Sequence, residues 1–203
     1  MKLLSRKDLL CAVSAGVLTG LIIQGILIFL KTTLPWHVAG WWLVFIVPVC
    51  WILGVQLGYF LGRWFHFFDN FGKFSAIGFA NAAVDFGVLN LSIYLSGINH
   101  GLWISGFKVI SFIVAVTHSF LWNRYWVFEE GRSGSAGGAY AKFMGVMIVS
   151  LGVNVAVFSL IVNFVHPPGN LEANTWANLS AAAGSAVALV VSFVGFRTVV
   201  FKK

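Results

Sequence analysis

The sequence contains few charged residues and few cysteines. Asp, Glu, Lys and Arg make up 9% of its 203 residues, whereas hydrophobic residues make up 59%, and the mean hydropathy is +0.90. Because soluble domains carry about 25% charged residues, this composition excludes an ordinary soluble fold. The two cysteines, Cys11 and Cys50, lie inside apolar runs, which excludes a disulfide framework and a cysteine-based metal site. We therefore expect an integral membrane protein.

The sequence also lacks the common motifs of catalysis and metal binding. It contains no G-x-S-x-G, no H-E-x-x-H and no P-loop pattern, and its five histidines are too scattered to form a metal site. The protein is therefore not expected to be an enzyme or to hold a cofactor.

Long apolar runs dominate the sequence. A helix needs about 20 apolar residues to cross a bilayer, and six runs meet this length. They cover residues 9–30, 38–62, 75–96, 103–122, 140–165 and 176–196. The predicted fold class is all-α, a polytopic membrane protein with six transmembrane helices. Between the second and third runs, the aromatic segment 63–74 fits a short interfacial helix and an ordinary turn equally well.

The positive charges are distributed unevenly around these runs. If both chain ends are cytoplasmic, 11 of the 13 Lys and Arg lie on the cytoplasmic side, Lys31 lies outside and Lys108 lies within a span. This bias predicts a multi-pass protein of the cytoplasmic (inner) membrane with both termini in the cytoplasm. It also explains the net charge of +7 without a nucleic acid partner.

A pair of helices is repeated in the sequence. Both SFLWNRYWVF at 119–128 and SFVGFRTVVF at 192–201 contain Ser-Phe, three residues, Arg, two residues and Val-Phe. The stretches that start at Lys73 and Lys142 also align without gaps. Each repeat contains two spans, so the two repeats are predicted to have the same orientation across the membrane.

This repeat divides the chain into two predicted domains. Residues 1–63 form an N-terminal pair of transmembrane helices, and residues 64–203 form a four-helix core. Within the core, repeat one covers about residues 73–128 and repeat two about residues 142–201.

Several polar residues interrupt the apolar runs. The polar residues inside the predicted spans that we consider as site residues are Asn81, Asp85, Lys108, His118 and Asn154. Asn81 and Asp85 are four residues apart, which places them on one face of the third helix. Because charged and amide groups avoid lipid, we expect these residues to line an interior seam or a hydrated cavity.

Asp85 and Lys108 allow two interpretations. They form a buried bridge that only fixes helix register, or they act on a cargo. In the second case Asp85 binds sugar hydroxyls or carries a proton, while Lys108 contacts an anionic group nearer the outer face. His118, as a lone histidine in a span, fits a helix-packing partner better than a proton relay.

Arg124 and Arg197 occupy equivalent places in the two repeats, at the predicted cytoplasmic ends of their helices. A guanidinium offers a planar fork of donors that matches phosphate oxygens, so two such arginines in repeated positions can frame one phosphate. Alternatively, each arginine is a positive-inside anchor that reaches the interface. Each arginine is followed by Val-Phe at the same distance, which a need for positive charge alone would not explain.

At these residues the sequence resembles the GtrA-like family of small membrane proteins. The resemblance rests on KFSAIGFANAAVDFGVLNLSIYL, which starts at Lys73, and most specifically on the ending NRYWVF, and it covers about residues 70–203. It implies a role with polyprenyl-phosphate-linked sugars, undecaprenyl phosphate being one such carrier, beside a family-2 glycosyltransferase. The two extra N-terminal helices depart from the family pattern, and so does Phe196, which stands where repeat one has Asn123. The resemblance therefore implies that only the end with Asn123 and Arg124 has the full set of headgroup contacts.

The resemblance implies a flippase for a polyprenyl-phosphate-linked monosaccharide used in cell-surface polysaccharide glycosylation, and this is our hypothesis. The phosphate engages Arg124, with Arg197 and Asn123 assisting. The sugar passes Asp85 and Lys108, and the prenyl tail stays in lipid. Two alternatives remain, a non-transporting membrane partner that positions a family-2 glycosyltransferase and a small-solute or cation transporter coupled through Asp85. Six short spans make a small transporter, so we expect a homodimer or a complex.

Overall fold

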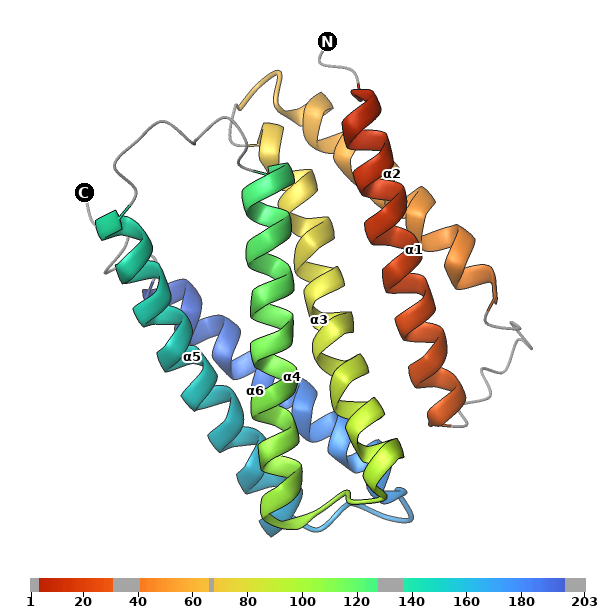
Figure 1. Ribbon diagram of the computed structural model, residues 1–203, viewed down its shortest axis with the longest axis vertical. Helices are drawn as coiled ribbons and strands as arrows, with labels where there is room; N and C mark the ends of the chain where they lie inside the picture. Colours follow the sequence, from red (N-terminus) through yellow and green to blue (C-terminus); the bar gives the residue numbers. More distant parts are fainter. Residues whose placement is uncertain (1–3, 31–40, 66–67, 128–136, 196–203) are drawn as a thin grey trace. The chain divides into compact units, whose positions relative to one another are not determined.

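The computed structural model describes residues 4–30, 41–65, 68–127 and 137–195 of the chain. These residues form six α-helices and one short π-helix, and the described part contains no strand (Figure 1). The elements are α1 (Arg6–Phe29), α2 (Trp41–Leu61), α3 (Phe68–Ser96), α4 (Gly101–Trp122), η1 (Asn123–Val127), α5 (Gly137–Phe164) and α6 (Ala173–Gly195). All six α-helices contain a span long and apolar enough to cross a membrane. The prediction of an all-helical protein with six transmembrane helices is confirmed.

The chain divides into two compact units that cut across the helices. Unit 1 comprises Met1–Gly87 and Ile113–Arg132, and unit 2 comprises Val88–Phe112 and Ser133–Lys203. Both α3 and α4 therefore contribute one part to each unit. The division into an N-terminal pair and a duplicated four-helix core stays a prediction from the sequence.

In unit 1, glycines allow α1 and α2 to pack closely. A Cβ atom on Gly16 would lie 2.4 Å from the Cα of Pro48, and one on Gly20 would lie 2.5 Å from the carbonyl oxygen of Leu43. The spacing Gly16-x-x-x-Gly20 is the small-residue pattern that brings helix backbones together in membranes. Side chains larger than hydrogen at these two positions would force the helices apart.

Helix α3 begins at Phe68, earlier than the predicted start at residue 75. Most of the segment 63–74 that we expected to form a separate interfacial helix or a turn is therefore the first part of α3. Asp69 in its first turn suits the positive end of the helix dipole. Gly72 lies so close to α2 that a Cβ atom there would stand 2.4 Å from the carbonyl oxygen of Gly54. This packing against α2 extends α3 beyond its apolar run.

Unit 1 has an apolar core to which α1, α2, α3 and η1 contribute. The buried side chains in it are Ala12, Ala15, Val55, Tyr59, Ile77, Trp126 and Val127. Trp126 is 2% exposed and is the largest of them. The π-helical end of α4 is thus anchored in the same core as the first helix of the chain.

In unit 2, α5 and α6 pack side by side (Figure 1). A Cβ atom on Gly184 of α6 would lie 2.8 Å from the carbonyl oxygen of Asn154, so these helices also approach at a small residue. Gly97 in the turn before α4 and Gly101 at the start of α4 have φ angles of +70° and +79°, a region that favours glycine. The amide of Gly101 donates a 2.6 Å hydrogen bond to the side chain of Asn163, which joins the start of α4 to the end of α5.

Candidate functional site

Of the predicted site residues within the spans, Asn81, Asp85 and His118 lie in unit 1. Asp85 on α3 is 5% exposed, as expected for a carboxyl group that avoids lipid. One turn earlier, the Oδ1 atom of Asn81 is buried and has no hydrogen-bond partner within the described ranges. On α4, both ring nitrogens of His118 are likewise buried, and no partner for them occurs in the part of the chain that the structure describes. The ring of His118 lies near Trp122, with 6.1 Å between the ring centroids.

Two further predicted residues, Lys108 and Asn154, lie in unit 2. Lys108 is fully buried, and its Nζ lies 6.0 Å from the ring centroid of Phe158 on α5, a cation–π distance. Asn154 stands one turn before Phe158 and is 1% exposed. Its Nδ2 donates a 3.3 Å hydrogen bond to Ser185, but its Oδ1 has no partner among the described residues. The structure thus brings Lys108 to the helix that carries Asn154.

The predicted bridge between Asp85 and Lys108 stays a prediction. Asp85 belongs to unit 1 and Lys108 to unit 2. Both side chains are buried, which agrees with the expectation that charges inside spans face away from lipid.

The predicted phosphate ligands stand at helix ends. Asn123 and Arg124 are the first two residues of η1, the π-helical segment that continues α4. Their side chains, and the whole of Arg197, lie outside the described residues, so the phosphate site stays a prediction. The π-helix itself was not predicted, and such segments occur often at functional sites.

Several other polar side chains within unit 2 form hydrogen bonds with one another. The amides of Asn90 on α3 and Asn178 on α6 exchange two hydrogen bonds of 2.6 and 2.7 Å. The hydroxyls of Ser150 and Ser192 lie 2.7 Å apart, which links α5 to α6. Paired groups of this kind hold helices together and have little capacity left for a ligand. The unpaired atoms of Asn81, His118 and Asn154 differ from them in this respect.

A charge cluster in unit 1 was not predicted from the sequence. Its centre is Asp8, in the first turn of α1, which is 6% exposed. The Oδ1 of Asp8 pairs with the Nζ of Lys73 at 2.5 Å and accepts a 3.1 Å hydrogen bond from the indole of Trp126. Its Oδ2 accepts hydrogen bonds of 2.8 Å from the hydroxyl groups of Tyr59 and Ser5. Four side chains from four segments therefore converge on one carboxylate.

One local signal for this cluster exists in the sequence. Ser5 and Asp8 have the spacing of a capping box, and the structure shows both of its hydrogen bonds at the start of α1. The other partners are 51 and more residues away from Asp8, so no local pattern indicates them.

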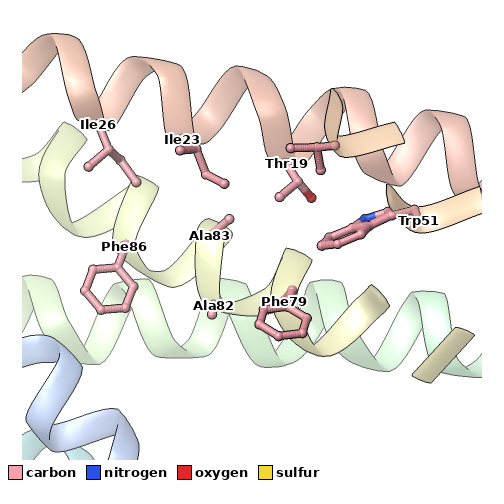
Figure 2. Close-up of a pocket in the computed structure, with 9 residues that line it drawn as sticks. Thr19, Ile23, Ile26, Trp51, Phe79, Ala82, Ala83 and Phe86 are labelled. Atoms are coloured by element: carbon pink, nitrogen blue, oxygen red, sulfur yellow. The ribbon is translucent and has the colours of Figure 1, made fainter. Parts of the chain in front are cut away.

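Unit 1 also contains an apolar pocket of about 300 Å³, lined by α1, α2 and α3 (Figure 2). Its lining residues are Thr19, Ile23, Ile26, Val47, Trp51, Phe79, Ala82, Ala83 and Phe86. The hydroxyl of Thr19 donates a 2.7 Å hydrogen bond to the carbonyl oxygen of Ala15 in its own helix. None of the lining residues is charged, so this pocket suits hydrocarbon and cannot bind a phosphate or a sugar well.

Comparison with known protein families gives a match over the second part of the chain. A family model described as "GtrA/DPMS, transmembrane domain" matches residues 73–201, which is nearly two thirds of the chain. The matched region starts at Lys73, within α3, and extends beyond the end of α6 to residue 201. Helices α1 and α2 lie outside it. No curated protein and no solved structure matches the chain.

Proposed function

Because the chain belongs to the GtrA/DPMS transmembrane-domain family, whose members are membrane proteins linked to lipid-linked sugars, we propose that it is a flippase. Its cargo in this proposal is a polyprenyl-phosphate-linked monosaccharide, which it moves across the cytoplasmic membrane for glycosylation of cell-surface polysaccharide. Both termini lie in the cytoplasm, as the distribution of Lys and Arg favours.

The observation that carries this proposal is the set of unpaired polar atoms on three residues inside the spans. Asn81, His118 and Asn154 each bury a polar side-chain atom that has no hydrogen-bond partner in the described part of the chain. Leaving such an atom unsatisfied costs about 1–3 kcal/mol. Amide and imidazole groups match the hydroxyls of a sugar, each of which donates and accepts hydrogen bonds. A monosaccharide that reaches Asn81 or His118 in unit 1, or Asn154 in unit 2, would satisfy the unpaired atom there, whereas a hydrocarbon chain would not.

The buried charges support a polar and partly anionic cargo. Asp85 accepts hydrogen bonds from sugar hydroxyls, and Lys108 attracts an anionic group. An ionised residue in the middle of a span costs about 2.5–3.5 kcal/mol on insertion scales, so it is retained where it acts. The prenyl tail stays in lipid and needs no polar path.

The phosphate of the cargo is assigned to the cytoplasmic helix ends. In this proposal the guanidinium of Arg124 binds two phosphate oxygens, and Asn123 and Arg197 assist it. The protein catalyses no covalent step itself. A family-2 glycosyltransferase makes or uses the sugar lipid beside it, and a homodimer provides the second half of a small transporter.

Native mass spectrometry of the full-length protein tests the phosphate assignment. A polyprenyl monophosphate is added to wild type and to Arg124→Ala, and the bound fraction is compared. We expect Arg124→Ala to lose binding and the control Arg63→Ala to retain it. Arg63 is also an arginine near a helix end, but it is exposed, lies near the ring of Phe60 and precedes the matched region. Equal binding by wild type and Arg124→Ala would refute the assignment.

Transfer between leaflets separates flipping from its alternatives. Proteoliposomes that contain the protein and a labelled sugar lipid are assayed for movement of the label between leaflets. Copurification with a glycosyltransferase together with no transfer would identify a docking partner instead. No transfer of the sugar lipid, together with uptake of a small solute or cation that survives charge reversal at both Arg124 and Arg197, would identify a small-solute or cation transporter.

A further inference from the structure

The Asp8 carboxylate is held by more donors than a simple surface ion pair requires. It has contacts with Lys73, Tyr59, Trp126 and the Ser5 side chain, and the Ser5 backbone amide also donates to it at 3.2 Å. The Nζ of Lys73 lies 5.5 Å from the ring centroid of Tyr59 and 6.0 Å from that of Trp126. The cation of Lys73 thus lies over the rings of two residues that also donate hydrogen bonds to Asp8.

This cluster joins the two parts of the chain that the family match separates. Asp8 and Tyr59 belong to α1 and α2, outside the matched region, whereas Lys73 and Trp126 lie inside it, near the start and the end of the predicted first repeat. Trp126 is the fourth residue of η1, two positions after Arg124. A hydrogen bond from Trp126 to α1 therefore acts on the short segment that carries Asn123 and Arg124.

The sequence alignment of the repeats shows that only the first repeat has the full set of partners. Lys142 corresponds to Lys73, but Val199 stands where the first repeat has Trp126. Valine has no donor for a carboxylate. Repeat one also has Asn123 where repeat two has Phe196. Asp8 of α1 therefore has its partners in repeat one, which also contains Asn123 and Arg124, the proposed headgroup contacts.

We propose that Asp8 is a positioning residue, supplied by the N-terminal helix pair, that holds Trp126 and thereby orients η1 for phosphate binding by Arg124. This inference rests on the proposed function. A carboxylate fixed by donors from α2, α3 and η1 keeps η1 from rotating about the axis of α4. Asp8 also neutralises Lys73, so Lys73 does not compete with Arg124 for the phosphate.

The test uses the full-length protein with two readouts. Fluorotryptophan is incorporated, the Trp126 signal is assigned with Trp126→Phe, and fluorine NMR is compared between wild type and Asp8→Ala. Binding of a polyprenyl monophosphate is measured on the same samples. We expect Asp8→Ala to shift the Trp126 signal and to weaken binding by about tenfold or more, the effect of losing hydrogen bonds to a charged group near the ligand segment.

Acetate provides a chemical rescue. It has the size of the carboxylate that Asp8→Ala removes, and Lys73, Tyr59 and Trp126 remain to bind it. We expect added acetate to return the Trp126 signal and the lipid affinity of Asp8→Ala toward wild type, and to change nothing in Asp8→Ala/Lys73→Met. Absence of rescue in the single variant would overturn the positioning role.

Two control variants exclude indirect effects. Glu172→Gln removes an exposed acid outside the spans and is expected to leave both readouts unchanged. Gly16→Ala loosens the contact of α1 with Pro48 at a distance from the cluster. If Gly16→Ala weakened lipid binding as much as Asp8→Ala at equal thermal stability, Asp8 would have only a structural role.

The remaining outcomes are also decisive. If Asp8→Ala does not fold, Asp8→Asn is measured in the same way. If neither variant folds, Asp8 is required for folding, and the proposal is overturned. If wild type binds no polyprenyl phosphate, the proposed function fails, and the Trp126 signal with its acetate rescue alone decides whether Asp8 orients η1. An unshifted Trp126 signal with unchanged binding would overturn the inference while the proposed function stands.

Discussion

The indole nitrogen of Trp126 donates a 3.1 Å hydrogen bond to the Oδ1 of Asp8, although 118 residues separate the two in the sequence. Trp126 lies in the π-helical end of α4, and Asp8 lies in the first turn of α1. The contact therefore connects the N-terminal helix pair to the most specific motif of the family region, and its removal has a measurable consequence.

Trp126→Phe is expected to destabilise the protein by about 1–3 kcal/mol, because a buried carboxylate loses one of its donors while most of the aromatic packing is kept. Unfolding in mixed detergent micelles measures the change. Trp51→Phe is the matched control, since the Nε1 of Trp51 is buried without a partner in the described part of the chain. The control should therefore cost little. Equal destabilisation by the two variants would contradict the proposed energetic role of the Asp8 hydrogen bond.

Gly16→Ala is expected to destabilise the contact of α1 with α2. The new Cβ would stand 2.4 Å from the Cα of Pro48, so one helix has to move, at a cost of about 1–3 kcal/mol. Gly25→Ala in the same helix has nothing within 4 Å and should be neutral or slightly stabilising. The melting temperatures of both variants in detergent check this difference, and a neutral Gly16→Ala would show that the close approach of these helices is absent in solution.

Asn90 and Asn178 should show a coupling energy in a double-mutant cycle. Their two mutual hydrogen bonds predict about 0.6–1.7 kcal/mol, the range found for hydrogen bonds between membrane helices. The variants are Asn90→Leu, Asn178→Leu and the double variant, compared by unfolding in micelles. Additive effects would mean that the two amides do not interact.

Asp85→Asn is expected to lower the rate of sugar-lipid transfer in proteoliposomes. The amide keeps the size of the carboxyl group but can no longer carry a charge or exchange a proton. Glu172→Gln, which changes an exposed acid outside the spans, serves as the control. If transfer is unchanged in Asp85→Asn, Asp85 only fixes helix register.

Much of the fold could be predicted because its determinants are local. A run of about 20 apolar residues indicates a span wherever it occurs, so all six helices were expected. The start of α3 was predicted too late, because the contact of Gly72 with Gly54 that extends it depends on the packing of another helix. The π-helix at 123–127 was missed for a similar reason, since its residues are anchored in the core of unit 1 through Trp126 and Val127.

The candidate site was predicted less completely. The burial of Asp85, Lys108 and Asn154 agrees with the expectation that polar groups in spans avoid lipid. The pairing of Asn90 with Asn178 was not predicted. Each asparagine begins an Asn-Leu-Ser tripeptide, but hydrophobic periodicity does not show that the two tripeptides are close in space. The phosphate ligands Arg124 and Arg197 stay a prediction.

The sequence by itself determined that this chain is a six-span membrane protein, because hydropathy is a property of the chain alone, and the match of residues 73–201 to the family model also needs no structure. Only the tertiary structure decided which polar groups satisfy one another and which are left unpaired. Asn90 and Asn178 are partners, Asp8 is held by Lys73 and Trp126, and Asn81 keeps a buried oxygen without a partner in the described ranges. The physical reason is that hydrogen bonds join residues that are close in space, and spacing along the chain does not reveal that proximity.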